Sequence, residues 1–581
     1  MDKNVYEFIS KKSNDPIIEW RTCRVSGKQF AIYESDSKFY KKIWPLYWWQ
    51  KFSVPLPTLC PEERMRRRLA WRNERTLYER KCDWSGGKIV SMYNPTSPYK
   101  VYDQKIWWSD VWDARDYGVD VDFNTSLVSQ FDMLMKSVPH SALNGANNQE
   151  NSVYTNYSVA NKNTYLSFGP TENDTCMYGK FINSCTQSYD CLSTYNCQWC
   201  YEGVDSHGCY QCQYFIDCSS CQNCLMIENC SNCKDCIGCV WLVGKEYYYL
   251  NKQVSKEEFD TIKKSFYPIN NASLCRLEKL FSPEKAQAIY PSANIQTCDN
   301  VSGDMLVNCH NCQFCFDLVD QEDCKYCRYG KKWRGSYDCV FTDPSGMFDS
   351  YEVCSSLSSH CCSVFFCLDC SHVYWSVECH NSHHLLWCVG LRDKEYCIFN
   401  KQYSKDEYEK LAVKVLEKMT WEDLRWEYMP ASISPYAYNE TVAQEYFPLT
   451  QQETLSRGWR WLDKKPSVNL PENAKVIQWN ELPDDIWSVG EDILWKIISC
   501  RRSQRPFRIM KAELDFYRKS NISLPQLHPD ERHRDRLSRK PSKSLHLRKC
   551  DKTHEEILSI YPNNSPFKVF GQSAYIQKIH W

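Results

Sequence analysis

The chain has 581 residues, a formal net charge of -1 and 25% charged residues, which excludes a disordered polyelectrolyte and exceeds one ordinary hydrophobic core. Cysteine is the outlier, with 35 residues. The first residues lack the apolar stretch of a signal peptide, and no window is apolar enough for a membrane helix. We therefore expect a cytoplasmic protein without membrane contact, whose cysteines are thiols or metal ligands rather than disulfides.

The two ends of the chain resemble each other. CRVSGKQF (23–30) aligns with CRRSQRPF (500–507), and LPTLCPEERMRRRL (56–69) aligns with LPQLHPDERHRDRL (524–537). Cys60 and His528 therefore occupy one position, and zinc accepts either side chain as a ligand. This alignment predicts a zinc-ribbon-like α+β module at each end.

Each end supplies three candidate zinc ligands, namely Cys23, Cys60 and Cys82 in the first module and Cys500, His528 and Cys550 in the second. Ser26, Glu63 and Ser503 stand where a second C-x2-C cysteine is expected. His554 would complete the second set, but its counterpart is Gly86. Zinc binding and a ribbon that keeps its fold without metal are both consistent with these residues.

The tract WWSDVWDARDYGVDVDF (107–123) brings five aspartates among aromatic residues. Such carboxylates can coordinate a divalent cation. The alternatives are a loop that faces a partner and a cap on the first coil of the repeat that follows.

The cysteines between residues 176 and 239 all keep one phase of three. Fourteen cysteines occur there, and every gap between neighbours is a multiple of three residues. The other residues of that phase are mostly Ser, Thr or Gly, with Ile182, Phe215 and Ile227 as larger exceptions. This period fits neither a helix nor a flat strand. We interpret these cysteines as small buried core residues rather than as ligands of a metal cluster.

A period of twelve residues arranges these cysteines in columns. One column contains Cys185, Cys197, Cys209, Cys221 and Cys233, and a second contains Cys200, Cys212, Cys224 and Cys236. This predicts a narrow parallel β-solenoid in which each coil points four small residues inward. Turn-forming residues precede many cysteines and are expected at the corners: Asp190, Asn196, Asp217, Asn223, Asn229, Asn232 and Asp235.

A second cysteine block predicts a second solenoid. Seven cysteines from Cys309 to Cys354 share one phase, and six from Cys361 to Cys397 share another. A bulge or an extra loop residue near Cys361 would produce this slip. Both blocks end alike, in GKEYYYLNKQVSKEEF (244–259) and DKEYCIFNKQYSKDEY (393–408). We expect a last strand and a helix that caps each open end.

Together these patterns predict a mainly β chain with five parts. They are a zinc-ribbon-like module at 1–123, a solenoid with its capping helix at 124–270, a second one at 271–420, a connecting segment at 421–498 and a zinc-ribbon-like module at 499–581. PDDIWSVGEDILWKI (483–497) is expected to form a helix that leads into the last module.

Several longer strings support a family resemblance, among them LCPEERMRRRLAWRNERTLYERKCD, WWSDVWDARDYG, KEYCIFNKQYSKDEYEKL, SPYAYNETVAQEYFPLT and LHPDERHRDRL. They resemble a group of large cysteine-rich proteins with zinc-ribbon-like ends from bacteria of the Candidate Phyla Radiation. The resemblance covers nearly the whole chain and implies an architecture rather than an activity. Members of that group usually have fuller C-x2-C pairs than this chain.

The arginines at the two ends favour a nucleic-acid partner. Residues 500–550 carry fifteen Lys or Arg against five Asp or Glu. The candidate phosphate contacts are Arg64, Arg66, Arg67, Arg68 and Arg72 in the first module and Arg532, Arg534, Arg536, Arg539 and Lys540 in the second. The alternative is a solvated helix whose arginines pair with neighbouring acids such as Glu62, Glu63 and Asp535.

His360, His372 and His384 are spaced by twelve, with His380 and His383 nearby, so three imidazoles should stack on adjacent coils. Such a ladder can bind zinc, nickel or copper, and a solvent-facing coincidence is the alternative. No phosphate-binding loop, dinucleotide fingerprint or hydrolase motif occurs. The sequence therefore favours a non-enzymatic scaffold that binds nucleic acid, a ribonucleoprotein or protein partners, with a thiol-rich metal-binding or redox protein as the alternative.

Overall fold

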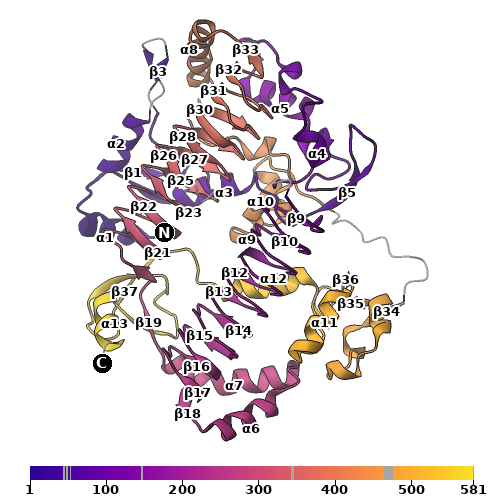
Figure 1. Cartoon of the computed structure of the whole chain (residues 1–581). Helices are drawn as coiled ribbons and strands as arrows, with labels where there is room; N and C mark the ends of the chain where they lie inside the picture. The colour runs from indigo at the N-terminus through magenta and orange to yellow at the C-terminus, as the bar shows by residue number, and fades with distance from the viewer. Residues whose placement is uncertain are drawn as a thin grey trace.

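A computed structural model describes residues 1–43, 46–47, 50–52, 54–145, 148–341, 346–424, 426–463 and 475–579. It is rich in strands, as predicted, and two large sheets of ten and fourteen strands dominate it (Figure 1). The parallel strands β9–β17, within residues 155–249, are called the first ladder here. Strands β20–β32, within residues 295–398, are called the second ladder.

The first ladder keeps a register of twelve residues. Leu192 pairs with Val204, and Leu225 pairs with Ile237. An antiparallel strand, β18, closes the sheet. The strands are β9 (Thr155–Asn156), β10 (Ser167–Phe168), β11 (Lys180–Asn183), β12 (Leu192–Tyr195), β13 (Val204–His207), β14 (Gln213–Ile216), β15 (Leu225–Glu228), β16 (Lys234–Val240), β17 (Glu246–Tyr249) and β18 (Lys252–Gln253).

The backbone conformation of the first ladder repeats every three residues. In Cys221–Asn223, the cysteine is buried, Gln222 bridges to Lys234 on the next coil, and Asn223 has a φ of 54°. The same positive φ recurs at all seven predicted corner residues, from Asp190 to Asp235. Asn and Asp tolerate this left-handed conformation better than most residues do. Six of the seven predicted corner residues lie at bends between strands, whereas Asp235 lies within β16.

Hydrogen bonds explain why the interior uses Cys, Ser and Thr rather than aliphatic residues. The thiol of Cys200 lies 3.4 Å from the carbonyl oxygens of Gln198 and Cys209 and is placed to donate to either. The hydroxyl of Ser206 accepts from the backbone N–H of Cys218, one coil further on. A small side chain with a polar atom thus fills the narrow interior and pairs inward-facing backbone groups that burial would otherwise leave unsatisfied.

Three of the larger inward residues lie beside a glycine, which makes room for them. A Cβ atom on Gly203 would lie 2.4 Å from the ring of Phe215, and one on Gly179 would lie 2.5 Å from Ile182. The second ladder repeats this at Gly330, where a Cβ would lie 1.8 Å from the indole of Trp333.

The second ladder has the same register of twelve with local changes. Its strands are β20 (Ile295–Gln296), β21 (Gly303–His310), β22 (Cys315–Glu322), β23 (Arg328–Lys331), β24 (Trp333–Arg334), β25 (Tyr337–Val340), β26 (Met347–Phe348), β27 (Tyr351–Cys354), β28 (Leu357–Ser359), β29 (Cys362–Phe365), β30 (Leu368–Val377), β31 (His383–Leu386), β32 (Glu395–Ile398) and an antiparallel β33 (Lys401–Gln402). A bulge lies between Leu357 and Ser358.

The sequence analysis wrongly placed Cys354 in one phase with the cysteines from Cys309 to Cys339. Cys339 pairs with Val353 at a register of fourteen, so Cys354 aligns with Val340 instead of continuing the cysteine column. Val353 in turn pairs with Val364 at a register of eleven. The slip thus begins one coil before Cys361, because the extra residues enter between β25 and β26.

Both ladders end in a last strand followed by a helix, as predicted, with a short antiparallel strand between the two. Helix α6 (Lys256–Phe266) follows β18, and helix α8 (Lys405–Trp421) follows β33. Ser255 accepts from the backbone of Glu258, and Ser404 accepts from that of Glu407. The two capped ends lie at opposite extremes of the molecule, α6 at the bottom and α8 at the top of Figure 1.

The terminal segments cross over to reach the ladders. The N-terminal module (1–123) packs on the second ladder through α3, and the C-terminal module (499–579) packs on the first ladder through α12. Their elements are α1 (Lys3–Ser13), β1 (Ile17–Thr22), β2 (Gln29–Tyr33), α2 (Glu34–Lys42), β3 (Leu46–Tyr47), β4 (Gln50–Lys51), α3 (Pro61–Leu69), β5 (Tyr78–Lys81), β6 (Lys88–Ser91), β7 (Val101–Tyr102) and α4 (Gln104–Trp107), and β35 (Ile497–Ser499), β36 (Pro506–Phe507), α11 (Lys511–Ser520), α12 (Pro529–Arg539), β37 (His546–Lys549), β38 (Glu556–Ser559), β39 (Lys568–Phe570) and α13 (Gln572–Ile579).

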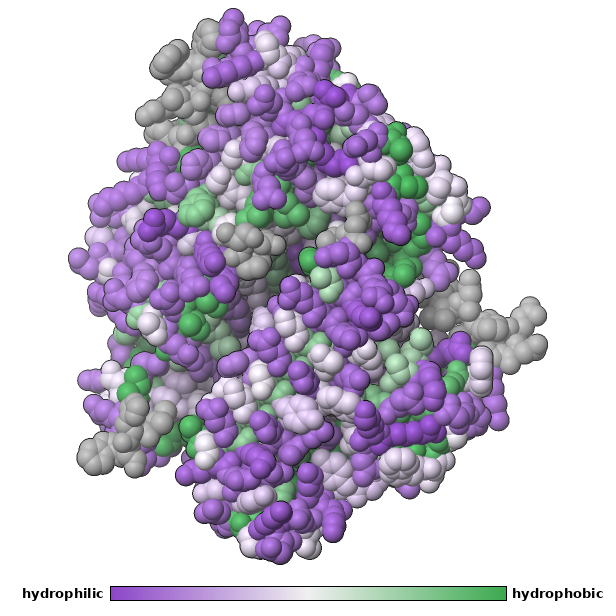
Figure 2. Space-filling view, viewed as in Figure 1, coloured by the Kyte–Doolittle hydropathy of each residue, from purple (hydrophilic) through white to green (hydrophobic). Residues whose placement is uncertain are grey.

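The remaining segments connect these parts. They contain α5 (Leu127–Ser137), β8 (His140–Ser141), α7 (Asn271–Gln287), β19 (Ile289–Pro291), α9 (Val442–Tyr446), α10 (Gln451–Ser456) and β34 (Val476–Gln478). The helix predicted at 483–497 is wrong. Two short 3-10 turns, Ile486–Ser488 and Glu491–Trp495, lie on either side of Gly490 instead. The face in Figure 2 is mainly hydrophilic, with hydrophobic residues in separate small patches.

Candidate functional site

Four cysteine turns share one backbone geometry. In each, a cysteine follows the first strand of a hairpin, its N–H donates to the residue five positions on, and its carbonyl accepts from the residue four positions on. The four cysteines are Cys23, Cys82, Cys500 and Cys550. The residue four positions on has a positive φ in every case, at Gly27, Gly86, Gln504 and His554. The alignment of the two ends therefore corresponds to four equivalent turns, two in each module.

At two of these turns, the N-cap residue of a later helix directs its backbone N–H at the cysteine sulfur. The N–H of His528, which caps α12, lies 3.2 Å from the sulfur of Cys500. The N–H of Asp103, which caps α4, lies 3.2 Å from that of Cys82. Burial raises the pKa of both thiols, but hydrogen bonds to the sulfur outweigh this effect. Ser85 donates to Cys82, and His528 and Ser503 donate to Cys500, so the pKa of each cysteine lies below its usual value.

Cys23 and Cys60 form the closest approach to a ligand pair. A hydrogen bond from the Cys60 thiol lowers the pKa of Cys23, and the same bond raises that of Cys60. The hydroxyl of Ser26 lies 3.6 Å from the Cys60 sulfur. The two thiols titrate as a coupled pair, which loses its first proton below the usual thiol pKa and its second above it.

The predicted zinc ligands are not gathered into complete sets. Cys82 belongs to a different core cluster from Cys23 and Cys60, and Cys550 to a different one from Cys500. His554 is exposed at the tip of its turn. A structural zinc ion takes four ligands. Among the described residues, no group of three or more His, Cys, Asp or Glu side chains is placed to hold a metal ion.

The arginines of α12 reach into the first ladder. Arg536 donates to Asp190 at 2.7 Å and to Glu202 at 2.8 Å, which occupy corners of successive coils. Arg532 also pairs with Asp190. Lys540 continues the row and lies 2.5 Å from Asp205. Residues four apart share one face of a helix, so Arg532 and Arg536 face Asp190 together, and Lys540, just past the end of α12, extends the row.

The arginines of α3 make the equivalent contacts on the second ladder. Arg64 donates to Asp338 at 3.1 Å, and Arg68 donates to Asp338 at 3.0 Å and also to Glu352. Arg72 follows and donates to Glu74 at 2.6 Å. These positions match Arg532, Arg536 and Lys540 in the alignment of the two modules. The duplicated modules thus dock on the duplicated ladders in the same way.

Burial removes half of the predicted phosphate contacts from the surface. The exposed fractions of Arg64, Arg68, Arg72, Arg532 and Arg536 are 1%, 0%, 3%, 5% and 0%. Arg67 is partly buried against Glu427, and Arg66 against Glu63. Arg534 and Arg539 are exposed and pair with Glu531 and Glu202. In this arrangement the buried guanidinium groups hold the modules to the ladders and are not available to a phosphate.

A basic groove remains between the C-terminal module and the first ladder. Its volume is about 570 Å³, and its lining includes four arginines, two tyrosines, Glu202 and Asp535. The arginines are Arg501, Arg502, Arg532 and Arg539, and the tyrosines are Tyr201 and Tyr214. Arg502 pairs with Asp535 at 2.7 Å. Arg501 is exposed and forms no ion pair with a described residue, so its positive charge is uncompensated by a direct partner.

The predicted histidine ladder forms. The ring centroids of His360 and His372 lie 5.1 Å apart, and those of His372 and His384 lie 4.9 Å apart. Burial, together with the charges of its neighbours His360 and His384, lowers the pKa of His372 to about 4. The hydroxyl of Ser371 lies 2.8 Å from Nδ1 of His383. His380 lies apart from the three stacked histidines and is buried beside Trp107 and Trp108.

The aspartate-rich tract packs on the end of the second ladder. Asn400 donates to the carbonyl of Ala114 at 3.0 Å, and the N–H of Val119 donates to the carbonyl of Phe399. Asp120 pairs with Lys401 at 2.6 Å. The tract therefore covers the last coil of the second ladder, not the first coil of the first ladder.

Sequence reasoning missed the acidic partners of the arginines. Asp190 and Glu202 are spaced by twelve and occupy the position before an inward residue, so both belong to one column of corners. An acidic column beside a helix with cations four residues apart was the available signal. No family model matches the chain, and no curated protein or solved structure matches it. Among the described residues, none of the helices has the length and apolar character needed to span a bilayer.

Proposed function

We propose that the chain is a non-enzymatic binding scaffold that contacts nucleic acid through the basic groove of its C-terminal module. The scaffold consists of two narrow cysteine-rich β-solenoids and two zinc-ribbon-like modules. The carrying observation is the groove of about 570 Å³, which gathers Arg501, Arg502 and Arg539 beside one face of a ladder. Guanidinium groups lining a groove suit a phosphate backbone, which requires positive charge but no fixed base sequence.

The buried ion pairs support a scaffold role. Arg536 and Arg68 fasten the two modules to the ladders, and the nearest in sequence of the carboxylates that they contact is 270 residues away. Removing one partner of such a pair is strongly unfavourable, which makes the docking specific. The modules and the ladders therefore present a fixed surface to a partner.

The test measures binding of a short fluorescein-labelled single-stranded RNA by anisotropy at several salt concentrations. We expect affinity to fall steeply as salt rises, because binding releases counterions from the phosphates. Arg501→Glu combined with Arg502→Glu should weaken binding and reduce the salt slope by about two, one for each lost contact. Arg532 and Arg536 are unsuitable for this test because both are buried and pair with Asp190, so their loss would also disturb the docking of the module.

Lys414→Glu is the matched control. Lys414 is exposed on α8, at the opposite end of the molecule, and its substitution changes the net charge by the same amount per residue. It should leave RNA affinity unchanged. Equal weakening by both kinds of variant would assign binding to net charge alone, and an affinity independent of salt would contradict the proposal.

A further inference from the structure

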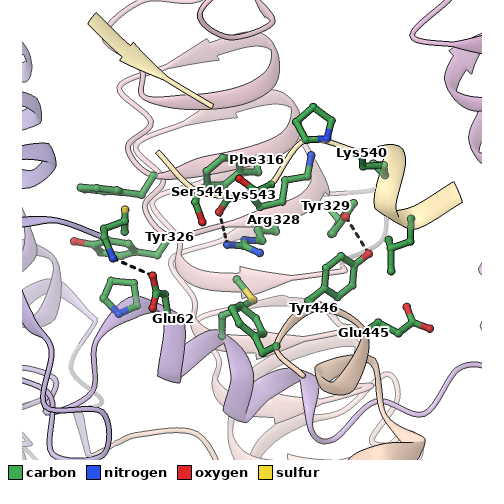
Figure 3. Close-up of a pocket in the computed structure, with 18 residues that line it drawn as sticks. Glu62, Phe316, Tyr326, Arg328, Tyr329, Glu445, Tyr446, Lys540, Lys543 and Ser544 are labelled. Carbon is green, nitrogen blue, oxygen red and sulfur yellow. Dashed lines mark hydrogen bonds and ion pairs between the residues drawn. The ribbon is translucent and has the colours of Figure 1, made fainter. Parts of the chain in front are cut away.

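A cavity of about 250 Å³ lies where four segments of the chain meet. Its lining comes from the N-terminus and the start of α3, the second ladder around β22 and β23, the end of α9, and the end of α12 with the residues after it up to Ser544. Figure 3 shows Arg328 near the middle of this cavity, with Tyr326 and Glu62 to one side and Tyr329 and Tyr446 to the other. The cavity therefore exists only when both modules are docked.

The walls of the cavity are largely aromatic. Phe314, Phe316, Tyr326, Tyr329, Tyr446 and Phe447 line it, together with Met65. The hydroxyls of Tyr329 and Tyr446 lie 3.1 Å apart and hydrogen bond to each other. These rings offer flat apolar faces and edges to a ligand.

The other charged groups of the lining already have partners. The N-terminal amine lies 3.0 Å from Glu62, and Glu445 lies 2.6 Å from Lys180. Lys540 lies 2.5 Å from Asp205, and Lys543 lies 2.8 Å from Asp317. Each of these charges is compensated by a group of opposite sign within the chain.

Arg328 is different. Its guanidinium donates one hydrogen bond, 3.0 Å to the carbonyl of Lys543, and forms no ion pair with a described residue. It lies over the rings of Phe316 and Phe447, at 5.2 and 5.8 Å from their centroids. Burial holds the pKa of Arg328 below its usual value, although the nearby Tyr329 and Asp317 favour the charge. An arginine carries five N–H donors, so most of its donors are free to meet a ligand.

We propose that this cavity binds a small monocarboxylate with a flat apolar body. The carboxylate accepts two hydrogen bonds from the Arg328 guanidinium, whose fork matches the two carboxylate oxygens. One uncompensated guanidinium balances one negative charge, which favours a monoanion over a phosphate dianion. A cavity of about 150 Å³ holds benzene, so about 250 Å³ accommodates a ring together with its carboxylate.

The test titrates the full chain with benzoate by calorimetry. We expect one benzoate per chain. Benzamide, with the same ring and no charge, and inorganic phosphate should both bind on the order of tenfold more weakly or not at all. Arg328→Gln should weaken benzoate binding by at least about tenfold, because the charge and the fork are lost together.

A second variant keeps the charge and removes the space. Ser544 lines the cavity, and Ser544→Trp should abolish benzoate binding by filling it while the unfolding midpoint in urea stays close to that of the wild type. Arg334→Gln is the matched control, since Arg334 is exposed on the same ladder and pairs with Glu322. It should bind benzoate as the wild type does. The proposal is overturned if benzoate does not bind, if benzamide or phosphate binds equally well, or if Arg328→Gln leaves the affinity unchanged in a folded protein.

Discussion

Arg536 and Arg68 make the same contact on different ladders. Arg536 bridges Asp190 and Glu202 on the first ladder, and Arg68 bridges Asp338 and Glu352 on the second. Both guanidinium groups are fully buried. Because the two modules align at these positions, one docking interaction has been duplicated along with the segments that it joins. The N-terminal module takes the second ladder and the C-terminal module takes the first.

Removal of Arg536 should therefore destabilise the chain strongly. Arg536→Ala removes the cation that contacts both Asp190 and Glu202 and leaves Asp190 with Arg532 and Glu202 with Arg539, and we expect a loss of up to about 3–5 kcal/mol in the free energy of unfolding. Arg534→Ala, two residues away, removes a side chain that is 54% exposed and should cost less than about 1 kcal/mol. Urea denaturation of both variants measures the difference. Equal shifts of the two midpoints would show that the buried bridge does not hold the module.

Thiol accessibility should separate two cysteines from the rest. Cys275 is exposed on α7 and Cys298 is partly buried, whereas the other cysteines are buried. Burial raises the pKa of Cys176 and of Cys361 to about 12, so these thiols are neutral at pH 7. Titration of the native protein with a disulfide reagent should show one fast thiol, which Cys275→Ser removes. The ladder thiols should react only in denaturant, and fast reaction of many thiols in the native protein would contradict a packed interior.

The glycine beside Phe215 should be intolerant of a methyl group. Gly203→Ala places a Cβ 2.4 Å from the Phe215 ring, and we expect a loss of about 1–3 kcal/mol from overpacking. Gly87→Ala is the control, since the nearest atom to its added Cβ is the Ser85 hydroxyl at 3.5 Å. Thermal unfolding of the two variants tests this. A wild-type midpoint for Gly203→Ala would mean that the ladder adjusts its coil spacing freely.

Acid should destabilise the fold through His380. Burial among aromatic rings, with the nearby charge of Arg392, lowers the pKa of His380 to about 3, against about 6.5 in an unfolded chain. The unfolded state then binds the proton first, so this contribution to stability is complete above pH 6.5 and is lost as the pH falls. Between pH 7 and pH 5 this residue alone should remove about 2 kcal/mol.

The measurement is urea denaturation of the wild type and His380→Phe at both pH values. The variant should lose less stability than the wild type on acidification, because a phenyl ring cannot take up a proton. His207→Phe replaces an exposed histidine and should keep the wild-type dependence on pH. An identical dependence on pH in all three proteins would exclude His380 as the titrating group.

Individual residues show which features of the fold could be predicted from the sequence. The phase of three from Cys176 to Cys239 predicted buried cysteines, the period of twelve predicted the parallel register, and Asp190 and Asn223 were correctly placed at corners. The spacing of His360, His372 and His384 predicted their stacking. Cys354 was misplaced because extra residues between β25 and β26 restored its phase by coincidence.

The sequence by itself determined the repeat, its corners and its caps, because each depends on residues within one or two coils of each other. Only the tertiary structure decided that Arg64 and Arg536 are buried, that Cys82 lies apart from Cys23 and Cys60, and that Arg328 faces a cavity. These outcomes depend on which module docks on which ladder. Arg536 and Glu202 are 334 residues apart, and no local period encodes a pairing at that distance.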